Sequence, residues 1–86
     1  MDEDFAAAFG AVLRSIRTDR GLSQEELAFK ADIHRNYVGL LERGVRQPSL
    51  ATIFYIADAL NLPASDLVAK VEIYRKQNLS QSGKCR

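Results

Sequence analysis

The sequence predicts an all-α fold with five helices in a single domain. Only two prolines, Pro48 and Pro63, interrupt the 86 residues. Apolar residues recur every three or four positions, and no long stretch alternates apolar and polar residues as a half-buried strand would. With 47% apolar residues, a chain of this length can bury one core and is too apolar to be disordered. We expect one domain at residues 1–77 and a disordered tail at 78–86.

An apolar stripe and a capping sequence predict the first two helices. Gly21 is placed to end the first helix, and the sequence SQEE that begins at Ser23 is typical of a capping box. In such a box the Ser23 hydroxyl accepts from the Glu26 amide, so we expect the second helix to begin there and to run to about Ala31. The stripe of the first helix comprises Phe5, Phe9, Val12, Leu13 and Ile16.

The remaining three helices are predicted by caps and apolar spacing. The third should run from His34 to Gly44, where glycine suits a left-handed helix end. Ser49 is the predicted N-cap of the fourth helix, and Asn61 can take the role of glycine at its end. Its predicted apolar face comprises Leu50, Ile53, Phe54, Ala57 and Leu60. The fifth follows Pro63, with these residues facing the core or an interface: Leu67, Val68, Val71 and Tyr74.

The second and third helices are separated by a very short turn, ADIH. Two helices that cross steeply at so short a turn need a small residue where their backbones meet, and Ala28 supplies it. Asp32 is expected to adopt a positive φ in the turn. The predicted filling of the angle between the helices is Leu27, Ala31, Ile33, Val38 and Leu41.

Residues 24–43, QEELAFKADIHRNYVGLLER, resemble the helix-turn-helix of the lambda-repressor-like family, the xenobiotic-response-element type of bacterial and phage transcriptional regulators. The likeness extends through GLSQEELA, ERG and PSL and covers roughly residues 10–69. Asp32 stands where the family usually has glycine, a mild departure because aspartate can adopt the left-handed region. Within the family, RNYVGLLERGVRQPSL is most similar to the controller proteins of restriction-modification systems.

The resemblance implies that the third helix enters the DNA major groove and reads base edges. Arg35 can donate two hydrogen bonds to guanine, Asn36 can pair with adenine or a phosphate, and Leu40 can contact a thymine methyl group. Gly39 removes a side chain that would hold the helix away from the groove, although it could also be a tolerated weakness of the helix. The predicted base-reading set is Arg35, Asn36, Gly39 and Leu40.

The resemblance also implies contacts to the DNA backbone and one internal ion pair. For each arginine in the backbone set, a solvated surface charge is an equal alternative, and Tyr37 could instead serve packing. Glu42 would repel DNA unless it is neutralised, and Arg17 matches the family's partner for that acid. The predicted backbone contacts are Gln24, His34, Tyr37, Arg43, Arg46 and Ser49.

One reading helix contacts too few base pairs to select a genomic site, so a homodimer on a two-fold operator is expected. Relatives similar to the controllers dimerise through the end of the fourth helix and the fifth helix, as the resemblance implies. The alternative is that the apolar residues of this region only close the core. The predicted interface comprises Leu62, Leu67, Val71, Ile73 and Tyr74.

Several function classes receive no support from the composition. One histidine, His34, and one cysteine, Cys85, cannot form a catalytic or metal-binding cluster, so we expect no enzyme, metal or cofactor. No apolar run could span a bilayer, and the acidic start MDEDF is unlike a signal peptide, which predicts a cytoplasmic protein. The family resemblance implies that it is encoded by a bacterium or a phage.

The net charge of +1 argues weakly against a nucleic-acid partner, but seven of the basic residues lie between positions 14 and 46. We therefore expect a sequence-specific double-stranded DNA-binding transcriptional regulator, which would also contact RNA polymerase if it is an activator. The alternative is an antitoxin-type module that uses the same fold to hold a partner protein.

Overall fold

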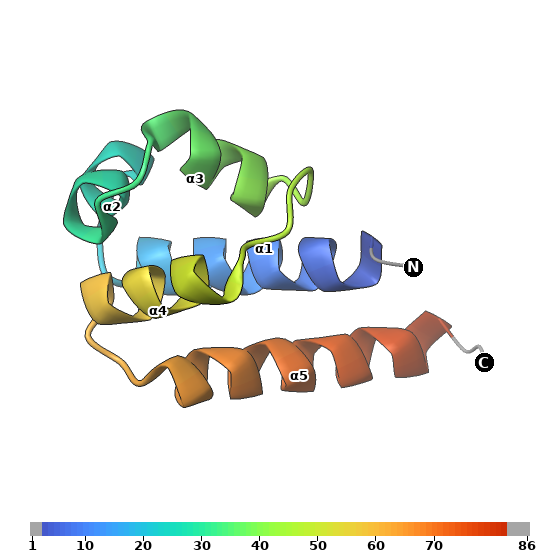
Figure 1. The fold of residues 1–86 in the computed structure, drawn as a ribbon. Coiled ribbons are helices and arrows are strands. Elements are labelled where there is room, and N and C mark those ends of the chain that lie inside the picture. The colour runs from blue at the N-terminus through green and yellow to red at the C-terminus, as the bar shows by residue number, and fades with distance from the viewer. Residues whose placement is uncertain (1–2, 83–86) are drawn as a thin grey trace.

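The computed structural model describes the backbone of residues 3–82 and the side chains of residues 5–78. These residues form five helices and no strand, so the predicted all-α class is confirmed (Figure 1). The helices are α1 (Glu3–Asp19), α2 (Gln24–Ala31), α3 (Arg35–Glu42), α4 (Leu50–Ala59) and α5 (Ala64–Ser82). Within this part of the chain, no helix is long and apolar enough to cross a membrane.

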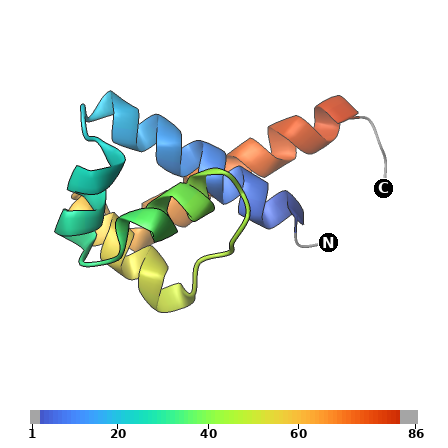
Figure 2. The same ribbon diagram turned by 90° about the horizontal axis from the view of Figure 1, so that it is seen from above.

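The helix α1 is the support on which the other elements are arranged. Both α3 and α5 pack against it, and Figure 1 shows them on different sides of α1. The short helix α2 packs against α3 and α4, and α4 packs against α5. Seen from above, α5 crosses α1 at an angle, and its last turns extend past the other helices (Figure 2). The pair α2–α3 therefore lies on the side of α1 opposite to α5.

Every helix, together with the residue that caps α4, contributes to a single core. Burying a large apolar side chain stabilises a fold by about 1.5–3 kcal/mol, so the fully buried residues supply most of the stability of this domain. The predicted filling of the angle between α2 and α3 is confirmed, with Ile33 partly buried and the others buried. The largest fully buried side chains are Leu13, Leu27, Val38, Leu41, Ile56, Leu60 and Leu67.

The predicted caps at the starts and ends of α2 and α4 are confirmed by the hydrogen bonds and backbone angles. The Glu26 amide donates to Ser23 Oγ (3.0 Å), and the Ser23 amide donates to Glu26 Oε1 (2.8 Å), which completes the capping box. The Thr52 amide donates to Ser49 Oγ (3.1 Å) at the start of α4. Asp32 and Asn61 adopt φ angles of 60° and 59°, the left-handed conformation expected of them.

Gly10 fixes how closely α1 and α3 approach. A Cβ built on Gly10 would lie 2.3 Å from the Leu41 carbonyl oxygen and 2.6 Å from that of Glu42. Both atoms are backbone atoms at the end of α3, so no side-chain movement could make room for it. Glycine therefore allows α3 to rest directly on α1.

The predicted apolar face of α4 is partly wrong. Leu50 and Phe54 are 70% and 51% exposed, whereas Ile56 is fully buried and Thr52 is 8% exposed. The residues of α4 are apolar around most of its circumference, so spacing alone did not define the inward face. The packing of α4 against α2 and α5 selects the side that carries Thr52, Ile56 and Leu60.

The predicted end of the domain is also wrong, because α5 continues to Ser82 and the predicted tail began at residue 78. No proline or glycine stands between Pro63 and Gly83, and the Asn78 side chain donates to the Tyr74 carbonyl one turn earlier (2.8 Å). These features favour continuation of the helix. Residues 83–86 of the predicted tail, including Cys85, lie outside the described residues.

Candidate nucleic-acid interface

The short connection between α2 and α3 sets the position of α3. Asp32 caps the end of α2, and the Ile33 amide donates to the Ala28 carbonyl (3.0 Å), so the chain reverses within a few residues. His34 is the N-cap of α3 with an extended backbone, and its side chain makes no capping hydrogen bond. The first two residues of α3, Arg35 and Asn36, are therefore presented to solvent.

The inner side of α3 fixes which residues its outer side displays. Val38 and Leu41 are fully buried against the core, and a helix places residues three or four positions apart on one face. The rest of its circumference, which forms the outer side, carries the exposed Arg35 and Asn36 and the half-buried Leu40. The helix cannot rotate without removing the two buried side chains from the core.

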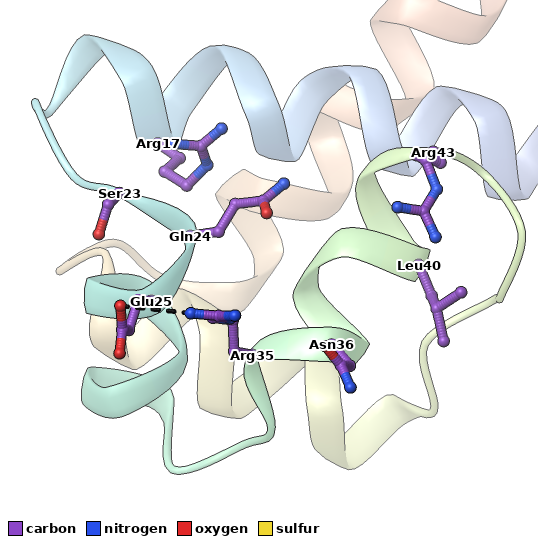
Figure 3. Close-up of a pocket in the computed structure, with 8 residues that line it drawn as sticks. All are labelled: Arg17, Ser23, Gln24, Glu25, Arg35, Asn36, Leu40 and Arg43. Carbon is purple, nitrogen blue, oxygen red and sulfur yellow. Dashed lines mark hydrogen bonds and ion pairs between the residues drawn. The ribbon is translucent and has the colours of Figure 1, made fainter.

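This outer side faces the start of α2 across a concave surface (Figure 3). Three of the four predicted base-reading residues line it, together with two of the predicted backbone contacts. The structure thus brings these predicted residues together from helices that are separate in sequence. The lining residues are Arg17, Ser23, Gln24, Glu25, Arg35, Asn36, Leu40 and Arg43.

The predicted ion pair between Arg17 and Glu42 is present at the base of this surface. Arg17 Nε donates to Glu42 Oε2 (2.5 Å) and Nη2 to Oε1 (3.0 Å), while Nη1 donates to the Leu22 carbonyl (2.7 Å). The side chains are only 11% and 3% exposed. The hydrogen bond to Glu42 raises the pKa of Arg17 above its ordinary value, so Arg17 stays charged. The pair therefore joins the end of α3 to α1 and neutralises the acid.

Gln24 belongs to the same network. Its Nε2 donates to Glu42 Oε1 (3.0 Å), so the donor group expected to contact a phosphate is bound to a carboxylate in this structure. A contact from Nε2 to DNA requires that this hydrogen bond be exchanged or shared. Gln24 nevertheless stands at the first turn of α2, where backbone amides have no partner within the helix. This position is consistent with a contact to the DNA backbone.

Gly39 is buried beneath two side chains of this surface. A Cβ built on it would lie 3.5 Å from Arg43 Nη1 and 3.8 Å from Gln24 Oε1, which are ordinary contact distances. The fold therefore tolerates alanine here. The predicted role of Gly39 in close approach to DNA remains a prediction.

The other predicted backbone residues do not line the concave surface. His34 and Arg46 are exposed, at the start of α3 and in the loop after it. Tyr37 is half-buried and packs against the core, as its alternative reading expected. The Ser49 hydroxyl accepts from the Thr52 amide as the cap of α4. Among the described side chains, those of residues 5–78, no group of three or more His, Cys, Asp or Glu could hold a metal ion.

The predicted dimer interface needs one correction. Leu67 is fully buried within this chain, so it belongs to the core and offers no area to a partner. Ile73 is 56% exposed, whereas the other three predicted residues, Leu62, Val71 and Tyr74, are partly buried against the core. Val68 of α5, expected at the core or an interface, and Phe54 of α4, expected to face inward, add exposed apolar area, being 46% and 51% exposed.

Two residues that matter for the site were not singled out from the sequence. Gly10 gave no signal because its role depends on α3, which is distant in sequence. Glu25 forms an ion pair with Arg35, with 3.5 Å between Oε1 and Nη1. Its spacing of ten residues from Arg35 becomes informative only when the turn between α2 and α3 is known.

The fold and the site together define a helix-turn-helix unit of the lambda-repressor-like class. The match to known families agrees with this class, because the helix-turn-helix family matches residues 13–67. The chain belongs to the helix-turn-helix family.

Three relatives illustrate the range of similarity. The chain is 41% identical over 69 residues to the control protein C.BamHI of Bacillus amyloliquefaciens, covering 79% of this chain and 85% of that protein. It resembles the crystal structure of the restriction-modification controller protein C.AhdI from Aeromonas hydrophila (TM-score 0.70, 47% identity, 72% and 94% coverage). It also resembles the clp gene regulator ClgR from Corynebacterium glutamicum (TM-score 0.84, 28% identity, 91% and 83% coverage).

Proposed function

We propose that this chain is a sequence-specific, double-stranded DNA-binding transcriptional regulator that acts as a homodimer on a two-fold operator. The observation that carries the proposal is the placement of Arg35, Asn36 and Leu40 on the outer side of α3, in a helix-turn-helix with a buried inner side. The role is one of binding, without catalysis, and it is exercised in the cytoplasm.

The residues of α3 suit the major groove. Arginine can donate two parallel hydrogen bonds to guanine O6 and N7, asparagine can pair with adenine, and leucine can contact a thymine methyl group. Arg35 and Asn36 stand at the start of α3, the end of a reading helix that contacts base edges in helix-turn-helix proteins. Gln24 at the start of α2, Arg43 at the end of α3 and Arg46 in the loop after it are proposed to contact phosphates, which position the helix.

The names of the relatives support a more specific role. C.BamHI is a control protein, and C.AhdI is a controller of a restriction-modification system. We propose the same role here, with the genes of a restriction enzyme and its methyltransferase as the regulated targets. Genes for a restriction enzyme and a methyltransferase beside the gene for this chain would support the assignment. The assignment would be contradicted if the promoters that this chain regulates did not include those of such genes.

Selection of bound duplexes from a random pool tests the DNA-binding proposal. We expect enrichment of a palindromic sequence whose half-sites are centred about 10 base pairs apart, because two reading helices about 34 Å apart match one turn of DNA. The control protein is Arg35→Ala, which should enrich a degenerate pool. Recovery of unrelated sequences by the wild type would contradict sequence-specific binding.

The dimer is proposed to form through exposed apolar residues of α4 and α5. Val68 and Ile73 supply area that the core does not use, and a groove beside them is lined by Phe5, Phe9, Gln47, Pro48, Ile53, Val68 and Val71. Sedimentation of the wild type at micromolar concentration should show a dimer, and Ile73→Asp should shift it to monomer.

Phe29→Asp is the matched control, because Phe29 is 86% exposed on α2, away from α5. This variant should remain dimeric. Circular dichroism should show that both variants keep the helical fold. A folded Ile73→Asp variant that remains dimeric would place the interface elsewhere.

A further inference from the structure

We propose that Glu25 is a positioning residue that holds Arg35 in the orientation needed to recognise guanine. This inference rests on the proposed function, since it concerns how Arg35 reads DNA. It begins from the ion pair between Glu25 Oε1 and Arg35 Nη1, 3.5 Å apart, which joins the first turns of α2 and α3 (Figure 3).

The atoms in this contact leave the reading edge of Arg35 available. A guanidinium carries five N–H groups in a fixed plane. Glu25 occupies the Nη1 side, whereas Nε and Nη2 form another edge with two parallel N–H groups. Such an edge can donate to both O6 and N7 of one guanine. Glu25 can therefore keep its contact while Arg35 makes a bidentate contact to the base.

The exposure of the pair argues against a role in stability. The Arg35 and Glu25 side chains are 62% and 75% exposed, and ion pairs with such exposure contribute little to folding. Arginine has large conformational freedom, which is lost when it binds a base. A carboxylate that restricts the side chain before binding reduces this loss for the correct base.

Charge makes the arrangement selective. Glu25 lines the same concave surface as Arg35, Arg43 and Gln24. In the proposed complex its carboxylate would therefore lie near the DNA phosphates. Its repulsion weakens binding to every sequence, whereas its orienting effect on Arg35 favours only those with guanine at the contacted position. Glu25 should therefore raise the ratio of specific to non-specific affinity.

A double-mutant cycle tests the proposal. Competition binding with operator and scrambled duplexes gives the selectivity of four proteins: the wild type, Glu25→Ala, Arg35→Ala and the double variant. We expect Glu25→Ala to lower selectivity by about fivefold or more, the lower end of what a bidentate base contact provides. In the Arg35→Ala background the same change should have no effect.

Two substitutions by glutamine separate the effect of the hydrogen bond from that of the charge. Glu25→Gln keeps an oxygen that can accept from Arg35, so it should retain more selectivity than Glu25→Ala. Glu26→Gln removes the same charge from the next residue, and glutamine can keep the capping hydrogen bond to Ser23. Glu26 has no contact with Arg35 among those of the described side chains, so its substitution should leave selectivity unchanged.

The failure of this proposal differs from failure of the proposed function. If the wild type is selective and Glu25→Ala is equally selective, the positioning role alone is overturned. The same holds if Glu25→Ala lowers selectivity by the same factor in the Arg35→Ala background as in the wild type. An equal fall in Glu26→Gln overturns it too, because loss of charge would then explain the effect. A wild type that binds all duplexes equally overturns the proposed function and the positioning role with it.

Discussion

The last and first turns of α3 each carry an ion pair to a neighbouring helix. In the last turn, Glu42 pairs with Arg17 of α1, and both side chains are almost fully covered. In the first turn, Arg35 pairs with Glu25 of α2, and more than half of each side chain is exposed. The buried pair has two hydrogen bonds and an additional donor from Gln24, whereas the exposed pair is a single contact of 3.5 Å.

The difference assigns the two pairs to different tasks. Removing one partner of a buried pair leaves a charge without compensation, so the buried pair holds α3 against the domain. An exposed pair contributes only about 0–1 kcal/mol to folding, so Arg35 remains available for a contact to DNA. The same residue types thus serve as scaffold at the end of α3 and as a reading group at its start.

Two glycines show the same contrast. A Cβ on Gly10 would collide with the backbone of α3, whereas a Cβ on Gly39 would contact only the ends of flexible side chains. We therefore expect changes to the buried contacts of α3 with α1 to alter folding and changes at its DNA-facing surface to alter binding. Each of the following substitutions tests that division.

Gly10→Ala should have the largest effect on stability. The new Cβ must displace α1 from α3, and overpacking of this kind costs typically about 1–3 kcal/mol and occasionally more. Urea denaturation measures the change, with Gly39→Ala as the matched control. A Gly10→Ala protein with the denaturation midpoint of the wild type would show that α1 and α3 can separate without cost.

Glu42→Ala should lower the free energy of unfolding by roughly 1–3 kcal/mol and also impair DNA binding, because Arg17 loses its partner in a partly desolvated place. Thermal melting and gel shift measure the two effects. The control is Glu25→Ala, which removes the acid of the exposed pair and should not change the melting temperature. Equal melting of both variants would contradict the different roles of the buried and the exposed pair.

Arg46→Ala and Gln24→Ala should weaken binding to all sequences alike, since phosphate contacts carry no direct sequence information. For Arg46, the slope of log affinity against log salt concentration should fall by about one unit. Titrations of operator and scrambled DNA at several salt concentrations measure this. If the slope is unchanged, Arg46 is a solvated surface charge.

Gly39→Ala should stabilise the protein by about 0.5–1 kcal/mol, because alanine favours the helix and the space is available. Its DNA affinity should nevertheless fall, since a side chain would oppose close approach to the groove. Denaturation and gel shift on the same preparation measure both quantities. Unchanged affinity would make Gly39 only a tolerated weakness of α3.

Local sequence signals predicted the local features well. The capping box at Ser23, the cap at Ser49 and the positive φ at Asp32 depend on neighbouring residues, and each is present. The pair of Arg17 and Glu42, 25 residues apart, was predicted by the family resemblance and not by spacing. Features that depend on tertiary packing were harder to predict.

The errors have the same physical origin. Leu50 and Phe54 were expected inside because α4 is apolar around much of its circumference, and Leu67 was expected at an interface although it fills the core. Gly10 and Glu25 acquire their roles from α3, which no local pattern relates to them. Part of the reading surface could therefore be predicted, but the contributions of Gly10 on α1 and Glu25 on α2 could not.

The central claim, that the outer side of α3 reads DNA sequence, is tested most directly by competition binding of Arg35→Ala. The measured quantity is the ratio of affinities for the selected operator and a scrambled duplex at one salt concentration. For Arg35→Ala we expect this ratio to fall by the equivalent of about 1–3 kcal/mol. The affinity for scrambled DNA should change less, and the melting temperature should not change. An unchanged ratio in a folded Arg35→Ala protein would contradict the claim.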